Sequence, residues 1–239
     1  MNRRELGLGA AMAGLMAARQ ATAQQGRIAP QGGAAQAFYD TFNGQLSRLP
    51  ETLQPDVRAV YEITGWRPIW TAERLRALQT VAAGAERHGL AANDFFDFVG
   101  LAADANSAEI RATASALTYA RVLAEGRVRP ETVEELWEMQ KNRVDLPKGL
   151  TDAAAANRLP DWFEGLAPTD IGYSNLSSGY VRYSRLVREG GWPAFAAGAI
   201  IEPGSSDRRI TPLIRRLVAE GDLSQADGAR LTSQGVTYG

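Results

Sequence analysis

The stretch from Gly179 to Leu223, GYVRYSRLVREGGWPAFAAGAIIEPGSSDRRITPLIRRLVAEGDL, predicts two amphipathic helices in succession. Apolar residues recur in both parts at steps of three and four, which places them along one side of a helix. Gly190 and Gly191 predict the end of the first helix and Gly221 that of the second, because glycine adopts the left-handed conformation that closes a helix. Trp192 lies in the connection. The apolar residues are Leu176, Tyr180, Tyr183, Leu186 and Val187, then Ile210, Leu213, Ile214, Leu217 and Val218.

The composition is that of a globular protein. The 239 residues are 45% hydrophobic and 22% charged, which is enough apolar material for a substantial core. The 26 Lys and Arg residues are balanced by 27 Asp and Glu residues. No global basic field is present to attract a polyanion, so nucleic acid is not expected as a partner.

The N-terminus has the three parts of an export signal. Arg3 and Arg4 form the positive end, residues 6–18 a short apolar run, and Ala21 and Ala23 a small-x-small cleavage site. The paired arginines favour the twin-arginine route and therefore a periplasmic location. The run is shorter than the roughly 20 residues that span a bilayer, so no transmembrane anchor is expected after cleavage. The alternative is an uncleaved first helix.

The next segments alternate between loops and helices. Residues 24–36 are rich in Gln, Gly and Ala and predict a flexible leader. Aromatic and aliphatic residues from Phe38 to Leu49 keep a helical spacing, and Pro50 ends that helix. Thr71 can cap a helix that Gly89 closes.

Three more helices are expected before residue 170, one of them from Glu131 to Trp137 after Pro130. The first begins near Asn106, where Glu109 three residues later predicts a capping box, and it ends at Gly126. An alanine-rich helix is expected from Thr151. The fold class predicted for the whole chain is therefore all-α.

The order of these motifs resembles one family, the large multidomain murein L,D-transpeptidases. Their scaffold domain has W-x-P-x-W, then A-x-x-H-G-L, then a helix ending G-R-V-x-P, and further on a Tyr-rich helix, GGWP and D-R-R-I-x-x-L-I-R-R-L-x-x-x-G-D-L. The resemblance implies a helical scaffold at residues 37–203, after a signal peptide at 1–23, and an incomplete peptidoglycan-binding-like segment at 204–239. The matching residues up to the third motif are Trp66, Pro68, Trp70, His88, Gly89, Leu90, Leu117, Tyr119, Ala120, Leu123, Gly126, Arg127, Val128 and Pro130.

The chemistry of that family does not carry over to this chain. Its catalytic domain contains H-x-x-G and S-x-G-C-x-R, in which the cysteine thiolate attacks the stem peptide. Neither motif is present, and the 239 residues contain no cysteine. Because cysteine is absent, disulfides and thiolate metal sites are also excluded. The resemblance thus implies no catalytic residue, metal or cofactor here.

Other enzyme classes find little support. A glycan-cleaving site could be drawn from Glu138 beside Trp137, or from Glu164 beside Trp162. Acidic residues spaced along a helix more often form its solvated face. His88 is the only histidine and has no partner at a catalytic spacing, which favours a structural role.

Three tryptophans are candidates for contact with murein sugars. The indole faces of Trp66, Trp70 and Trp192 suit the apolar face of a pyranose. Each is also a good core anchor, and that alternative stays open.

The sequence leaves two functional hypotheses. The first is a non-catalytic scaffold that binds peptidoglycan or cell-wall synthesis proteins. The second is a fragment of a full transpeptidase. Only one complete helix, from about Thr211 with Pro212 in its first turn, is expected after residue 204. That helix would have to dock on the scaffold, pair with another molecule or remain poorly ordered.

Overall fold

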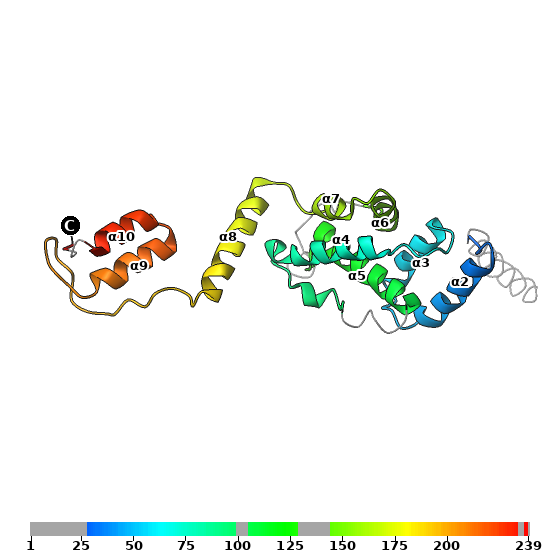
Figure 1. The fold of residues 1–239 in the computed structure, drawn as a ribbon, viewed down its shortest axis with the longest axis horizontal. Helices are drawn as coiled ribbons and strands as arrows, with labels where there is room; N and C mark the ends of the chain where they lie inside the picture. The colour runs from blue at the N-terminus through cyan, green and yellow to red at the C-terminus, as the bar shows by residue number, and fades with distance from the viewer. Residues whose placement is uncertain (1–27, 99–104, 129–143, 234–236, 239) are drawn as a thin grey trace, which may run out of the picture. The chain divides into compact units, whose positions relative to one another are not determined.

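The computed structural model describes residues 28–98, 105–128, 144–233 and 237–238. Within these ranges the chain is helical and has no strand, which confirms the all-α fold (Figure 1). It forms two compact units, the first ending at Thr169 and the second beginning at Asp170. The domain boundary expected after residue 203 stays a prediction.

The first unit is built around one long helix, α5. This helix packs against α2, α3 and α6, while α3 also contacts α6 and α4 contacts α7. Ten residues of α5 are buried, more than in any other described helix. The elements are α2 (Gly33–Leu46), α3 (Gln54–Ile63), α4 (Ala72–Ala83), α5 (Ala105–Glu125), α6 (Leu146–Ala155), α7 (Leu159–Glu164) and the 3₁₀ turns Ala85–His88 and Ala92–Asp94.

Aromatic rings fill the core between α2 and α3. The Phe38 and Tyr61 rings lie 4.9 Å apart, and Phe42 meets Trp66 edge to face at 5.3 Å. Trp66 follows α3 in the left-handed region, with φ of 60°, a conformation that costs a bulky residue about 1–3 kcal/mol. The cost is offset because the Trp66 side chain is 1% exposed and its Nε1 donates to Ile28 O at 2.6 Å.

A buried carboxylate joins the segment after Trp66 to α5. Glu109 is 6% exposed, and its two oxygens accept hydrogen bonds from the amides of Ile69, at 2.6 Å, and Trp70, at 3.1 Å. The Tyr61 hydroxyl donates to the same carboxylate at 3.3 Å. The predicted capping box is therefore wrong. Glu109 satisfies amides forty residues earlier in the chain, because α5 already includes Asn106 and burial makes those distant donors the better partners.

Several helix limits differ from the sequence expectations. Thr71 caps α4 as predicted, by accepting from Arg74 N. In contrast, α6 starts five residues before Thr151, because Asp145 caps it and Pro147 suits its first turn. Helix α2 begins at Gly33, inside the predicted leader, and α3 was not predicted.

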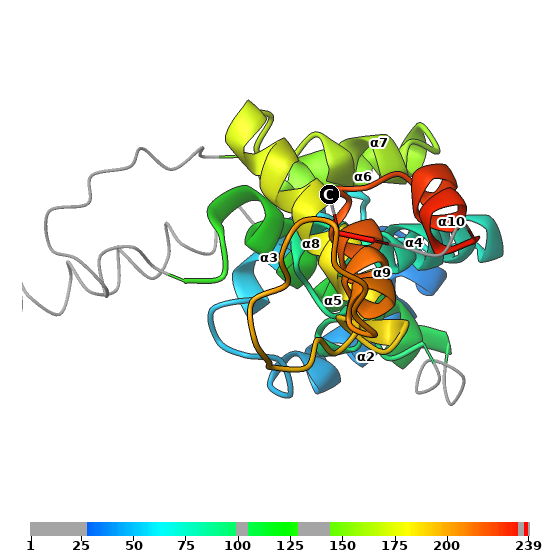
Figure 2. The same ribbon diagram turned by 90° about the vertical axis from the view of Figure 1, so that its left-hand side faces the viewer.

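The second unit contains α8 (Ile171–Arg188), α9 (Ile210–Glu220) and α10 (Gln225–Ser233). Gly190 and Gly191 have φ of 105° and 79°, as expected for the end of α8. Helices α9 and α10 lie side by side, as Figures 1 and 2 both show.

The expectation of a single helix after residue 204 is wrong, because α10 covers α9. Its sequence has almost no apolar stripe, so periodicity does not reveal it. Close approach depends on Gly228, where a Cβ atom would lie 2.5 Å from Val218 Cγ2. As a result Ile210 and Ile214 are only 3% and 5% exposed.

Helix α6 also approaches α7 through a glycine. A Cβ atom at Gly149 would lie 2.5 Å from Trp162 Nε1, whereas one at the helical Gly44 would meet nothing within 4 Å. We expect Gly149→Ala to lower the free energy of unfolding by about 1–3 kcal/mol through overpacking. The same change at Gly44 should raise it by about 0.5–1 kcal/mol. Urea unfolding followed by circular dichroism measures both, and a stabilised Gly149→Ala variant would contradict this packing.

Burial raises the pKa of Glu109, and the hydrogen bonds from Ile69, Trp70 and Tyr61 lower it only in part. The native carboxyl therefore holds its proton more tightly than the unfolded one. Its contribution to stability is full below the ordinary pKa of 4.5 and is lost as the pH rises through the folded-state pKa.

The test compares Glu109→Gln with Glu51→Gln, a change at an exposed glutamate. At pH 7 Glu109→Gln should lower the free energy of unfolding by about 1–3 kcal/mol. The glutamine amide has one acceptor oxygen, so its nitrogen cannot accept from the second backbone donor. The difference in the free energy of unfolding between the wild type and Glu109→Gln should widen as the pH is lowered toward 4.5. Urea unfolding at several pH values measures it, and a difference independent of pH would refute the linkage.

Candidate functional site

Trp192, the third candidate tryptophan, lies in the loop after α8 within a cluster of rings and guanidinium groups. Its ring meets Tyr183 edge to face at 5.9 Å, and the guanidinium of Arg216 on α9 lies 4.6 Å from the ring centre. Arg216 is oriented by an ion pair with Glu220 at 2.5 Å. Trp192 keeps 39% of its surface exposed, so a ligand can still reach the indole.

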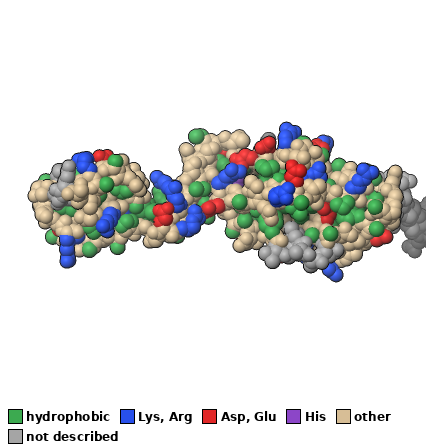
Figure 3. Space-filling view, viewed as in Figure 1, with side chains coloured by type: hydrophobic (Ala, Val, Ile, Leu, Met, Phe, Trp, Pro, Cys, Tyr) green, Lys and Arg blue, Asp and Glu red, His purple; other side chains and the backbone are tan. Residues whose placement is uncertain are grey.

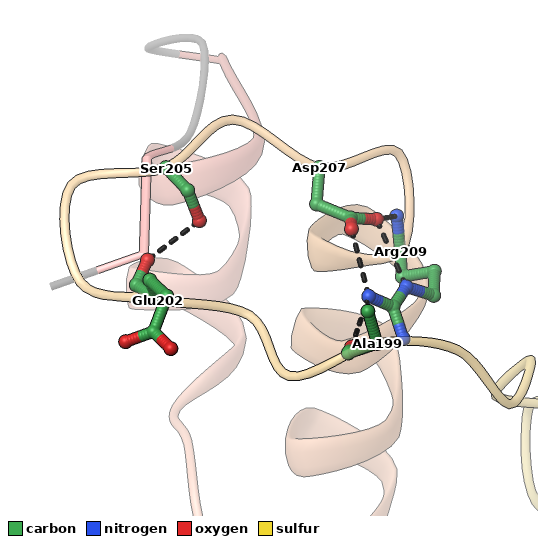
Figure 4. A network of polar contacts seen from close by, with 5 residues as sticks. All are labelled: Ala199, Glu202, Ser205, Asp207 and Arg209. Carbon is green, nitrogen blue, oxygen red and sulfur yellow. Dashed lines mark hydrogen bonds and ion pairs between the residues drawn. The ribbon is translucent and has the colours of Figure 1, made fainter.

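The loop from Trp192 to α9 is held by an ion pair at its far end (Figure 4). Asp207 accepts from the Arg209 amide at 2.8 Å and from the Arg209 side chain at 3.0 and 2.8 Å. Arg209 in turn donates to Ala199 O at 2.6 Å. The helix expected from about Thr211 begins one residue earlier, at Ile210, and Asp207 fixes the chain just before it.

A groove of about 640 Å³ lies between α8 and the pair formed by α9 and α10. Leu186, Ile214 and Val218 give it an apolar floor, and α10 lines the opposite side with small or polar residues. Its volume falls within the range of about 300–1,000 Å³ that is usual for small-ligand sites.

Charged side chains surround this floor. Arg182 and Arg185 from α8 and Arg215 from α9 line the groove together with a single acidic residue, Glu189. Figure 3 shows basic and acidic side chains gathered on the surface over α8. Arg185 and Arg215 make no ion pair with any described residue, so both guanidinium groups are available to a ligand.

The other two candidate tryptophans lie in the first unit and serve its core. Trp66 is buried, and Trp70 donates from Nε1 to Thr113 Oγ1 at 2.9 Å. A sugar could stack on Trp66 only if the core opened. The structure thus matches the core-anchor alternative for these two, and Trp192 is the exposed member of the three. The proposed cleavage site at Ala21 and Ala23 lies outside the described residues.

Of the residues considered for glycan cleavage, Glu164 belongs to the first unit, whereas the groove is formed by the second. The Glu164 carboxylate is engaged in an ion pair with Arg87, and Arg87 Nε donates to His88 Nε2 at 3.1 Å. Burial, followed by the charge of Arg87, lowers the pKa of His88, which favours a neutral ring. Glu138 and Trp137 lie outside the described residues. In the part of the chain that the structure describes, no three His, Asp or Glu side chains form a cluster suited to a metal ion.

Sequence reasoning missed the three arginines of the groove. Arg182 and Arg185 are three residues apart, a spacing that places both on one side of α8, and this was a usable signal. Arg215 had no such signal, because its position opposite α8 depends on how the loop returns the chain.

None of the described helices is long and apolar enough to cross a membrane.

The architecture is that of an all-α scaffold followed by a short helical pair. A family model described as Scaffold domain matches residues 55–180, just over half of the chain. The chain therefore belongs to the Scaffold domain family, and the predicted resemblance to the L,D-transpeptidase scaffold is confirmed. The start of a peptidoglycan-binding module remains a prediction. No curated protein and no solved structure shows significant similarity to the chain.

The Asp207 interaction makes a testable prediction about titration. Hydrogen bonds from the Arg209 side chain, and then from its amide, lower the pKa of Asp207 to about 2. Asp207 therefore supports the loop above its ordinary pKa of 3.8 and loses this effect as the pH falls through about 2.

Carbon-13 NMR of the Asp207 carboxyl group should show this low midpoint, and Arg209→Gln should move it back toward 3.8. Arg208→Gln removes the same charge without removing a hydrogen bond and should shift it less. An unperturbed midpoint in the wild type would contradict the geometry in Figure 4.

Proposed function

We propose that this protein is an exported, non-catalytic scaffold that binds peptidoglycan in cell-wall remodelling. Its membership of the Scaffold domain family is the observation that supports the proposal most strongly. None of the 239 residues supplies the sulfur nucleophile of the L,D-transpeptidase reaction that this scaffold resembles. Binding is therefore proposed without bond formation.

The two units suggest how the work is divided. The first presents a tightly packed helical core, with Glu109 and the aromatic rings holding its segments in place. The second exposes the Trp192 ring and a charged groove, which are surfaces that suit a ligand. An indole stacks on the apolar face of a sugar, and guanidinium groups pair with carboxylates, so both parts of murein have a counterpart here.

The N-terminal sequence supports the proposed location. The paired arginines, the short apolar run and the small residues at 21 and 23 form an export signal, which would deliver the chain to the periplasm where murein lies. Cell-wall synthesis proteins are the partners expected at that place.

Sedimentation with purified sacculi tests the function. The chain from residue 24 onward should sediment with sacculi, and Trp192→Ala should bind about three- to tenfold more weakly because it loses a stacking surface. Phe195→Ala is the matched control, because Phe195 lies in the same loop and is similarly exposed at 44%. That variant should bind like the wild type.

Absence of the wild-type chain from the sacculus pellet would refute murein binding. Equal losses in the Trp192→Ala and Phe195→Ala variants would instead show that Trp192 has no special part in it. Circular dichroism of each variant confirms that the helices are intact.

A further inference from the structure

The groove of the second unit carries charges of both signs, with more basic than acidic residues. Arg182, Arg185 and Arg215 line the groove, and Glu189 is the one acidic residue among the described residues that line it. Guanidinium groups bind carboxylates through paired hydrogen bonds, and a carboxylate binds an ammonium group. The complementary ligand therefore carries more than one carboxylate and one free amine.

The floor of the groove determines which kind of group can link the charged groups of the ligand. Leu186, Ile214 and Val218 present an apolar surface, and Ala219 and Ala229 add only methyl groups. Small apolar side chains fit such a floor and gain from burial, at roughly 25 cal/mol for each Å² removed from water. A long polyanion has few apolar groups to bury against this floor, and the carboxylate of Glu189 would repel it.

The groove does not suit a glycan chain. Protein sites for neutral sugars stack the ring on an aromatic face, and no aromatic side chain is among the described residues that line this groove. Trp192 packs against Tyr183 and Arg216 and is not one of the lining residues. Sugar and peptide would thus meet different parts of the second unit.

We propose that this groove binds a short peptide with small apolar side chains, several carboxylates and one free amine, as in the stem peptide of murein. The inference rests on the proposed function for the source of the peptide, and it adds which part of peptidoglycan the groove selects. The carboxylates lie against Arg185 and Arg215, and the amine lies toward Glu189.

The experiment is calorimetric titration of the chain from residue 24 onward with the synthetic peptide N-acetyl-L-Ala-γ-D-Glu-L-Lys, which carries two carboxylates and, on its lysine, one free amine. Three further probes accompany it, namely the same peptide with its carboxylates amidated, the peptide with its lysine amine acetylated, and chitotetraose. The free peptide should bind, amidation should weaken binding at least tenfold, and acetylation should weaken it severalfold. Heat from chitotetraose should be unaffected by changes in the groove.

Variants locate the site. Arg185→Gln and Arg215→Gln should each weaken peptide binding about tenfold, because each removes a charge-assisted hydrogen bond. Glu189→Gln should weaken binding of the free peptide and leave that of the acetylated peptide unchanged. Arg208→Gln is the control, because Arg208 is an exposed arginine of the same unit that does not line the groove.

The outcomes separate this inference from the proposed function. If sacculi bind the chain but the peptide does not, or if the arginine variants bind it normally, the groove assignment is wrong and murein binding stands. If the peptide binds through Arg185 and Arg215 while sacculi are not bound, the groove assignment holds and the proposed source of the peptide is wrong.

Discussion

The buried carboxylate of Glu109 is the contact on which the first unit depends. It takes the two amides of Ile69 and Trp70 out of competition with water and fixes the segment after α3 against α5. Leaving such donors unpaired in a core costs about 1–3 kcal/mol for each group. The contact also explains the W-x-P-x-W motif, because the first tryptophan enters the core and the second bonds Thr113 beside Glu109. The motif is thus a structural signature, and its presence points to the family through the fold.

The second unit buries much less of its surface than the first. No residue of α8 is buried, whereas α9 and α10 bury their contact through Gly228. Arg185 and Arg215 make no ion pair with any described residue, and such exposed groups are maintained at little cost because water solvates them. Both also lie beside an apolar floor. This combination is typical of a binding surface.

The sequence predicted the elements whose signals are local. Helical periodicity, the Thr71 cap and the paired glycines after α8 located α4, α5, α8 and α9, and the order of the motifs indicated the family. Helix α10 was not predicted, because its contact with α9 depends on a missing side chain at Gly228. Glu109 was misassigned, since spacing alone cannot distinguish a partner three residues away from one forty residues away. Arg215 was missed for the same reason, because its proximity to Arg182 and Arg185 depends on how distant segments of the chain pack.

We propose that this chain binds murein and forms no bond in it. The most direct test is to incubate the purified chain with sacculi rich in tetrapeptide stems and to separate the muropeptides by chromatography. The account predicts an unchanged muropeptide profile, because none of the 239 residues is a cysteine. The appearance of new 3–3 cross-links would contradict it.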